Sequence, residues 1–399
     1  MGGGLLQLVA YGAQDVYLTG NPQITFFKVV YRRHTNFSME SIEQTFNGSV
    51  GFGKRVTCQI SRNGDLIHRM YLQAAVPDTI NNDTYVDMIG LALIKSVELE
   101  IGGQRIDKHY GEWMYIWNEL SLPAGKAAGF GKMVGEHTTI LESAGPKDLY
   151  IPLEFFFCRN PGLALPLIAL QYHEVKVNIE FRDKAGCTRT GATQPTEDLQ
   201  ASLWVDYIFL DTDERRRFAQ LSHEYLIEQL QFTGDESVTG VNNKVKLNFN
   251  HPVKELVWVS QLDAMNTVAG GKQQYFNFTD RSNVAVGSDI EEGVNVVLAA
   301  KLQLNGHDRF AEREGSYFNM VQPFQHHENV PTSKGINVYS FALQPESHQP
   351  SGTLNMSRID AAVLNVQTSV ATAAKLKVFA LSYNVLRVMS GMGGLAYSN

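Results

Sequence analysis

The sequence is poor in cysteine and in clustered basic residues, and each shortage excludes a class of protein. Its three cysteines, Cys58, Cys158 and Cys187, are far apart and form no CxxC pair. That pattern supports neither a disulfide framework nor a structural zinc site, and it favours maturation in a reducing compartment. The net charge is −7, and compact basic clusters occur only at residues 32–34 and 215–217. We therefore expect no direct sequence-specific binding of nucleic acid, which requires dense positive charge.

Long apolar runs are missing as well. The sequence has no stretch of 18 apolar residues, and its first ten residues lack the positive charge of a secretory signal, so we expect no membrane-spanning or signal segment. At 399 residues the chain exceeds the size at which one core stops growing, which predicts two domains.

Most of the chain reads as short strands separated by turns. Residues 97–101 and 175–181 alternate apolar and polar side chains, as half-buried strands do. Residues 56–61 and 66–76 flank an Asn63-Gly64 pair, which predicts a β-hairpin. The same patterning predicts further strands at 203–210, 244–249, 256–260, 294–304, 362–366 and 376–381.

Helices are expected at two places. In residues 112–122 the apolar side chains of Trp113, Ile116, Trp117 and Leu120 recur at helical spacing and form one stripe. Residues 212–218 predict a short helix with Thr212 or Asp213 as its N-cap, and we place the linker between the domains there. The glycine-rich stretch 125–135 is expected to be a mobile surface loop.

An internal repeat supports two similar β-domains. The segment LEIGGQ at 99–104 resembles LQLNGH at 302–307. Pro161-Gly162 followed by VNI at 177–179 is similar to Ser351-Gly352 followed by LNV at 364–366. Short strands with turns every 8 to 12 residues are typical of antiparallel sandwiches. We therefore predict an all-β protein: two tandem eight-stranded antiparallel jelly rolls with few short helices.

Motifs for catalysis or cofactor binding are weak. Residues 48–55 fit the spacing GxxxxGK, but Arg55 stands where a phosphate loop needs Ser or Thr, and a strand follows instead of a helix. His326, His327 and Glu328 could suggest a metal site, but adjacent residues on a strand face opposite sides, so we interpret them as a polar loop. We expect no enzymatic activity, no cofactor and no metal.

Many segments resemble the major capsid proteins of nucleocytoplasmic large DNA viruses, especially the algal-virus (chlorovirus and phycodnavirus) type. The resemblance is specific in LVAYGAQDVYLTGNPQITFFK at 8–28 and YRRHTNF at 31–37. It continues over nearly the whole chain, in the segments 59–66, 98–107, 161–175, 204–212, 223–232, 248–252, 349–352 and 383–397.

This resemblance implies a double jelly roll that forms homotrimers, whose six jelly rolls make a pseudo-hexameric capsomer in an icosahedral shell. It implies four segments: an N-terminal arm at 1–27, a first jelly roll at 28–211, a linker helix at 212–223 and a second jelly roll at 224–399. The implied partners are neighbouring capsomers, minor capsid proteins and an internal viral membrane. The implied location is the virion, after assembly in the host cytoplasm.

The arm is expected to contact the inner side of the shell. Residues 1–27 contain no Lys or Arg and only one acid, so they cannot form a packed core and should order against a partner. Arg32 and Arg33 follow, and either bind an acidic neighbour or anionic membrane or pair with the body of the protein. The residues proposed for this contact are Leu5, Leu6, Leu8, Val9, Tyr11, Arg32 and Arg33.

Three further expectations concern the trimer interface, the outer towers and an alternative function. Trp113 and Trp117 are predicted to lie in the trimer interface. Residues 125–146 and 260–295 are predicted to form the outer towers, with Asn277 of the sequon Asn-Phe-Thr as a glycosylation site. The alternative function is a jelly-roll protein that binds glycans or attaches to a host, with Tyr275, Phe276 and Phe278 as exposed aromatic residues.

Overall fold

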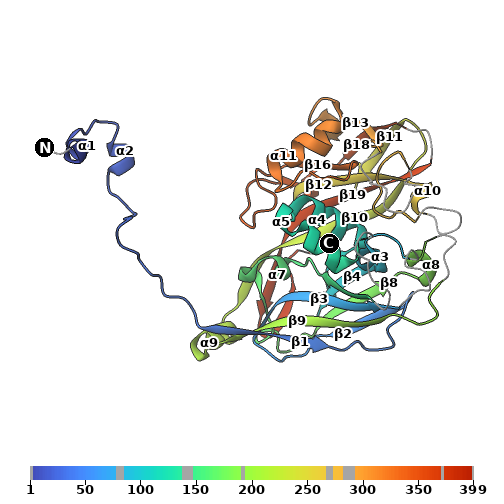
Figure 1. The fold of residues 1–399 in the computed structure, drawn as a ribbon, viewed down its shortest axis with the longest axis horizontal. Coiled ribbons are helices and arrows are strands. Elements are labelled where there is room, and N and C mark those ends of the chain that lie inside the picture. The colour runs from blue at the N-terminus through green and yellow to red at the C-terminus, as the bar shows by residue number, and fades with distance from the viewer. Residues whose placement is uncertain are drawn as a thin grey trace. The chain divides into compact units, whose positions relative to one another are not determined.

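The computed structural model describes residues 3–77, 85–136, 147–189, 194–266, 273–281, 293–369 and 373–397. The chain divides into an N-terminal unit, residues 1–36, and a body, residues 37–399. Strands of the body form four antiparallel sheets, two from residues 37–210 and two from residues 223–395 (Figure 1).

The first roll consists of two facing sheets. One has the order β1-β9-β3-β6, with β7 beside β3, and the other has the order β2-β8-β4-β5. The strands are β1 (Phe37–Gln44), β2 (Arg55–Gln59), β3 (Leu66–Val76), β4 (Ile94–Ile101), β5 (Gln104–His109), β6 (Lys147–Pro152), β7 (Leu165–Pro166), β8 (Val175–Phe181) and β9 (Gln200–Leu210).

The second roll repeats this arrangement. One sheet has the order β10-β19-β12-β16, with β17 and β20 attached, and the other has the order β11-β18-β13-β14, with β15 attached. The strands are β10 (His223–Val238), β11 (Asn242–Leu247), β12 (Pro252–Leu262), β13 (Val297–Leu304), β14 (His307–Asp308), β15 (Arg313–Glu314), β16 (Ile336–Ser340), β17 (Leu354–Asn355), β18 (Ala362–Thr368), β19 (Ala374–Met389) and β20 (Met392–Leu395).

The two rolls share one topology, which confirms the predicted double jelly roll. In the first roll β1 pairs with β9 and β2 with β8, and in the second roll β10 pairs with β19 and β11 with β18 in the same nested order. The repeated segments form equivalent hairpins. Gly102 and Gly103 join β4 to β5 at φ 58° and 85°, and Asn305 and Gly306 join β13 to β14 at φ 50° and 84°. Both turns need two left-handed residues, which Gly and Asn supply at little cost.

The predicted hairpin between residues 56–61 and 66–76 is wrong. β2 and β3 lie in different sheets, because the Asn63-Gly64 turn carries the chain across the sandwich. Before the turn, the Ile60 N–H donates to the carbonyl of Val175 on β8 (3.0 Å). After the turn, the Asp65 N–H donates to the carbonyl of Ile208 on β9, in the other sheet (3.1 Å).

Helices occupy the connections between strands. The predicted helices appear as α4 (Gly111–Ser121) and α9 (Thr212–Gln220), although the N-cap of α9 is Asp211. The glycine-rich stretch expected to be a loop forms α5 (Ala124–Val134), which ends at Gly135 with φ 79°. The remaining helical segments are α3 (Ile89–Leu93), α7 (Phe156–Arg159), η1 (Pro161–Leu163), α8 (Lys184–Cys187), α10 (Asp263–Asn266), η3 (Tyr317–Val321), α11 (Gln322–His326) and η4 (Met356–Arg358).

Two large hydrophobic cores hold the body together. One fills the second roll around Trp258, Phe318 and Leu376. The other fills the first roll and extends to one face of the second, where it includes Val257 and Phe379. The two rolls therefore share a continuous apolar joint.

The N-terminal unit contains two short helices, α1 (Gly3–Val9) and α2 (Val16–Thr19). Neither helix buries a residue. No helix in the described part of the chain is long and apolar enough to cross a membrane.

Candidate functional site

Helix α4 is the centre of the joint between the rolls (Figure 1). The ring of Trp113 lies 5.8 Å from that of Trp117 and 5.4 Å from that of Phe379 on β19. The two tryptophans are only 2% and 5% exposed within the single chain. Side chains buried by their own chain offer no surface to another subunit, so the predicted placement of Trp113 and Trp117 in the trimer interface does not fit the structure.

A buried ion cluster adds polar contacts to this joint. Glu112, the second residue of α4, lies 3.5 Å from Lys377 Nζ on β19 and 3.4 Å from Arg182 Nη2 in the first roll. Burial alone would raise the pKa of Glu112, but the two cations hold it below its usual value. The cluster stays charged at neutral pH and ties α4 to both rolls.

Residues 273–281 of the second roll also belong to the joint. Phe276 stacks on Tyr115 of α4 with a ring distance of 4.7 Å, and Arg182 lies 3.9 Å from the Tyr275 ring. Tyr275, Phe276 and Phe278 are each less than 5% exposed. The aromatic residues proposed as a glycan-binding surface are therefore core residues, and the alternative function loses its candidate site.

Asn277 lies in the same buried segment, with 1% of its surface exposed. Its Nδ2 donates to Gln274 Oε1 (2.7 Å) and to the Arg281 carbonyl (2.9 Å), while its Oδ1 accepts from the Thr279 N–H and hydroxyl. A glycan must be attached to Nδ2, so the structure contradicts Asn277 as a glycosylation site. Of the predicted towers, residues 137–146, 267–272 and 282–292 lie outside the described residues.

A second charged cluster ties the rolls together at Glu228 on β10. One carboxylate oxygen lies 2.6 Å from Lys254 Nζ on β12, and the other lies 2.9 Å from Arg159 Nη2 on α7 of the first roll. Lys254 is fully buried, and burial lowers its pKa despite the opposing effect of Glu228. Lys254 and Glu255 interrupt the apolar run of β12. Charged residues within such a run indicate that they form buried ion pairs.

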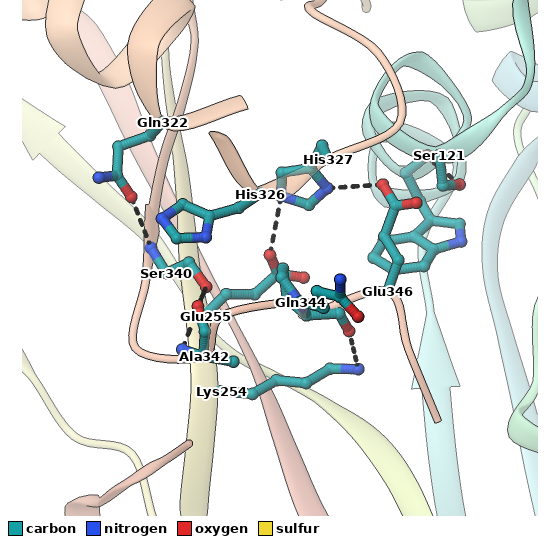
Figure 2. Close-up of polar contacts among 12 residues, drawn as sticks. Ser121, Lys254, Glu255, Gln322, His326, His327, Ser340, Ala342, Gln344 and Glu346 are labelled. Carbon is teal, nitrogen blue, oxygen red and sulfur yellow. Dashed lines mark hydrogen bonds and ion pairs between the residues drawn. The ribbon is translucent and has the colours of Figure 1, made fainter. Parts of the chain in front are cut away.

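His327 lies between two carboxylates, as Figure 2 shows. Its Nε2 is 3.0 Å from Glu255 Oε2 on β12, and its Nδ1 is 2.8 Å from Glu346 Oε1. Burial alone would lower the pKa of His327, but Glu255 and then Glu346 raise it to about 9. The polar-loop interpretation is wrong for His327, whose side chain is fully buried, and His326 ends helix α11. An imidazolium has no free lone pair, so this ring is a salt-bridge partner.

The arm residues chosen from the sequence are all on the surface of the N-terminal unit. Leu5, Leu6, Leu8, Val9 and Tyr11 are between 57% and 77% exposed, and Arg32 and Arg33 are also exposed. Such a density of apolar side chains in water is what a segment that orders on a partner presents.

Two exposed apolar surfaces of the body were not predicted from the sequence. On η3 and α11, Met320, Val321 and Phe324 are 52%, 39% and 78% exposed. On the sheet β1-β9-β3-β6, Tyr71 stacks on Trp204 and packs against Tyr150, each at a ring distance of 6.2 Å. Each of these three aromatic residues stands between two core residues of its strand. Because successive side chains of a strand point to opposite faces, this alternation indicates that the aromatic side chains face outward.

Comparison with known proteins gives a consistent result for both halves of the chain. Residues 25–211 match the family model described as "Major capsid protein N-terminus". Residues 214–394 match "Large eukaryotic DNA virus major capsid protein".

Individual relatives match over their full lengths. The chain is 60% identical to the major capsid protein of Pyramimonas orientalis virus and 48% identical to that of Paramecium bursaria Chlorella virus 1, with complete coverage of both chains. The solved structure of PBCV-1 VP54 superposes with a TM-score of 0.82 at 42% identity, over 94% of this chain and 100% of that one. The Faustovirus major capsid protein, at 12% identity and a TM-score of 0.76, shares the fold over 95% of this chain and 94% of its own.

Proposed function

Because the chain belongs to the family of large eukaryotic DNA virus major capsid proteins, we propose that it assembles as a homotrimer with six jelly rolls. It is a structural subunit of an icosahedral virus capsid. The observation that carries the trimer is the fusion of two rolls of one topology into a single body. Three such bodies supply the six similar units of a pseudo-hexameric capsomer.

The capsomer would have two kinds of contact beyond the trimer. Its sides would meet neighbouring capsomers, whose individually weak contacts add up through effective concentration. Its N-terminal arms would meet minor capsid proteins and the internal viral membrane, through Leu5, Leu6, Leu8, Val9 and Tyr11 with Arg32 and Arg33 behind them. Assembly would take place in the host cytoplasm, and the chain would do no catalysis.

Light scattering of the purified chain, with and without residues 1–27, tests this proposal. We expect the mass of three chains in both cases, because the arm is separate from the body that carries the rolls. A monomer in both cases would refute the homotrimer. A trimer that is lost with the arm would move the arm into the trimer contact and refute its assignment to the inner shell.

A further inference from the structure

The internal repeat brings two helical segments to the same place in the two rolls. Helix α4 begins at Gly111, and the helical segment that continues as η3 and α11 begins at Gly315, 204 residues later (315 minus 111). A Cβ at Gly111 would collide with the carbonyl oxygen of Leu91 in α3 and with that of Ile94, the first residue of β4. A Cβ at Gly315 would collide with that of Val297, the first residue of β13. Each helix therefore starts beside the first residue of the equivalent strand, at a glycine whose contact with backbone oxygens leaves no room for a side chain.

The corresponding faces of these helices have opposite environments. Ile116, Trp117 and Leu120 of α4 are buried. The positions 204 residues later are Met320, Val321 and Phe324, which form the exposed apolar strip on η3 and α11. A face that is covered in the first roll is uncovered in the second.

Trp113, at the start of the same helix, packs on the outer face of a sheet of the second roll. Phe379 of β19 contacts Trp113 and stacks on Phe232 of β10 with a ring distance of 4.7 Å. Both aromatic residues belong to the sheet β10-β19-β12-β16, on the side away from the core of the second roll.

The equivalent sheet of the first roll carries aromatic residues on the equivalent face. Trp204 of β9 lies opposite Tyr71 of β3, as Phe379 of β19 lies opposite Val257 of β12. Leu203 and Val205, on either side of Trp204, point into the core of the first roll, so Trp204 faces outward. Tyr150 of β6, packed against Tyr71, is 39% exposed.

We infer that the strip Met320, Val321 and Phe324 of one copy packs on the face formed by Tyr71, Tyr150 and Trp204 of the next copy. This contact rests on the proposed homotrimer and repeats between chains the joint that α4 makes within a chain. The contact is heterologous, because it joins two different surfaces. Three copies can therefore close into a ring, in which joints within a chain alternate with contacts between chains. Ser316 stands at the position of Glu112, so the contact lacks the ion cluster of the internal joint and is predominantly apolar.

Full-length variants test the two sides independently. We expect the wild type to have the mass of three chains by light scattering, and Phe324→Asp and Tyr150→Asp each to have the mass of one, because a buried unpaired carboxylate opposes the contact. Leu298→Asp is the matched control: Leu298 is 51% exposed on β13, in the other sheet of the second roll, and this variant should remain a trimer. Near-ultraviolet circular dichroism checks that each variant is folded. If Phe324→Asp does not fold, Met320→Asp tests the same strip.

The outcomes separate this contact from the trimer itself. A monomeric wild type refutes the homotrimer and this contact with it. A trimeric wild type whose Phe324→Asp and Tyr150→Asp variants remain trimers of unchanged stability refutes the contact alone. Dissociation of only one of the two variants, or dissociation of Leu298→Asp as well, refutes the pairing of these two surfaces.

Discussion

The salt bridges of His327 predict how the free energy of unfolding depends on pH. The pKa of this side chain rises from 6.5 in the unfolded chain to about 9 in the folded one. Below pH 6.5 both states bind the proton, and the stabilisation is fully present. Between pH 6.5 and 9 the folded state holds a proton that the unfolded state has lost, so the stabilisation falls by about 1.4 kcal/mol per pH unit. The total loss is about 3 kcal/mol.

His327→Gln isolates this contribution. We expect urea unfolding, followed by far-ultraviolet circular dichroism at one protein concentration, to show a wild type more stable than the variant at pH 6.5. The difference should shrink by about 3 kcal/mol by pH 9.5, as the histidine of the wild type loses its proton. Groups outside this cluster are present in both proteins, so their contributions to the pH dependence of unfolding largely cancel in the difference.

His326→Gln is the control, because the neighbouring ring contacts only the Leu343 carbonyl, with Nδ1 at 2.9 Å, among the contacts described for it. This variant should keep the pH dependence of the wild type. Parallel stability curves for the wild type and His327→Gln from pH 6.5 to 9.5 would refute the charged state assigned to His327.

The buried contacts of the joint and the repeat give three more expected outcomes. Trp113→Ala should lower the free energy of unfolding by about 3–5 kcal/mol, because it leaves a cavity in the joint; an unchanged urea midpoint would contradict that burial. Asn277→Ala should cost about 1–3 kcal/mol through lost hydrogen bonds, while peptide mass spectrometry of the virion protein should find Asn277 unmodified; a glycopeptide there would refute its burial. Gly111→Ala and Gly315→Ala should each destabilise by about 1–3 kcal/mol in thermal unfolding, because the new methyl group meets a carbonyl oxygen. Gly125→Ala on α5, where a Cβ meets open space, should stabilise by about 0.5–1 kcal/mol, and equal effects at all three glycines would contradict the packing.

The strands and the duplication were predictable because their signals are local. Alternation over β8 reflects one covered face, and the left-handed turns at Gly103 and Gly306 need particular residues wherever they occur. The hairpin prediction failed at Asn63-Gly64 because a turn sequence specifies a reversal of direction and leaves open which sheet receives the next strand. In this fold Asp65 continues into the opposite sheet.

The joint was not predictable, because its partners are distant in the sequence. Trp113 meets Phe379 only after both rolls have formed, and His327 meets Glu255 only after distant segments of the second roll have come together. The helical stripe of α4 correctly indicated an apolar contact, but a stripe does not distinguish a partner in the same chain from one in another. The sequon at Asn277 has the same limitation, since three residues carry no information about burial by the rest of the second roll.

The joint between the rolls can form only late in the synthesis of the chain on the ribosome. Helix α4 ends at Ser121, and Phe379, which covers its tryptophans, is synthesised about 260 residues later. At roughly 5–20 residues per second, that interval lasts on the order of 10–50 s. During this time the first half of the chain displays Trp113 and its neighbours to water and to other nascent chains. A first jelly roll that ended at residue 211 would lack Phe379, so the burial of this face depends on completion of the second roll.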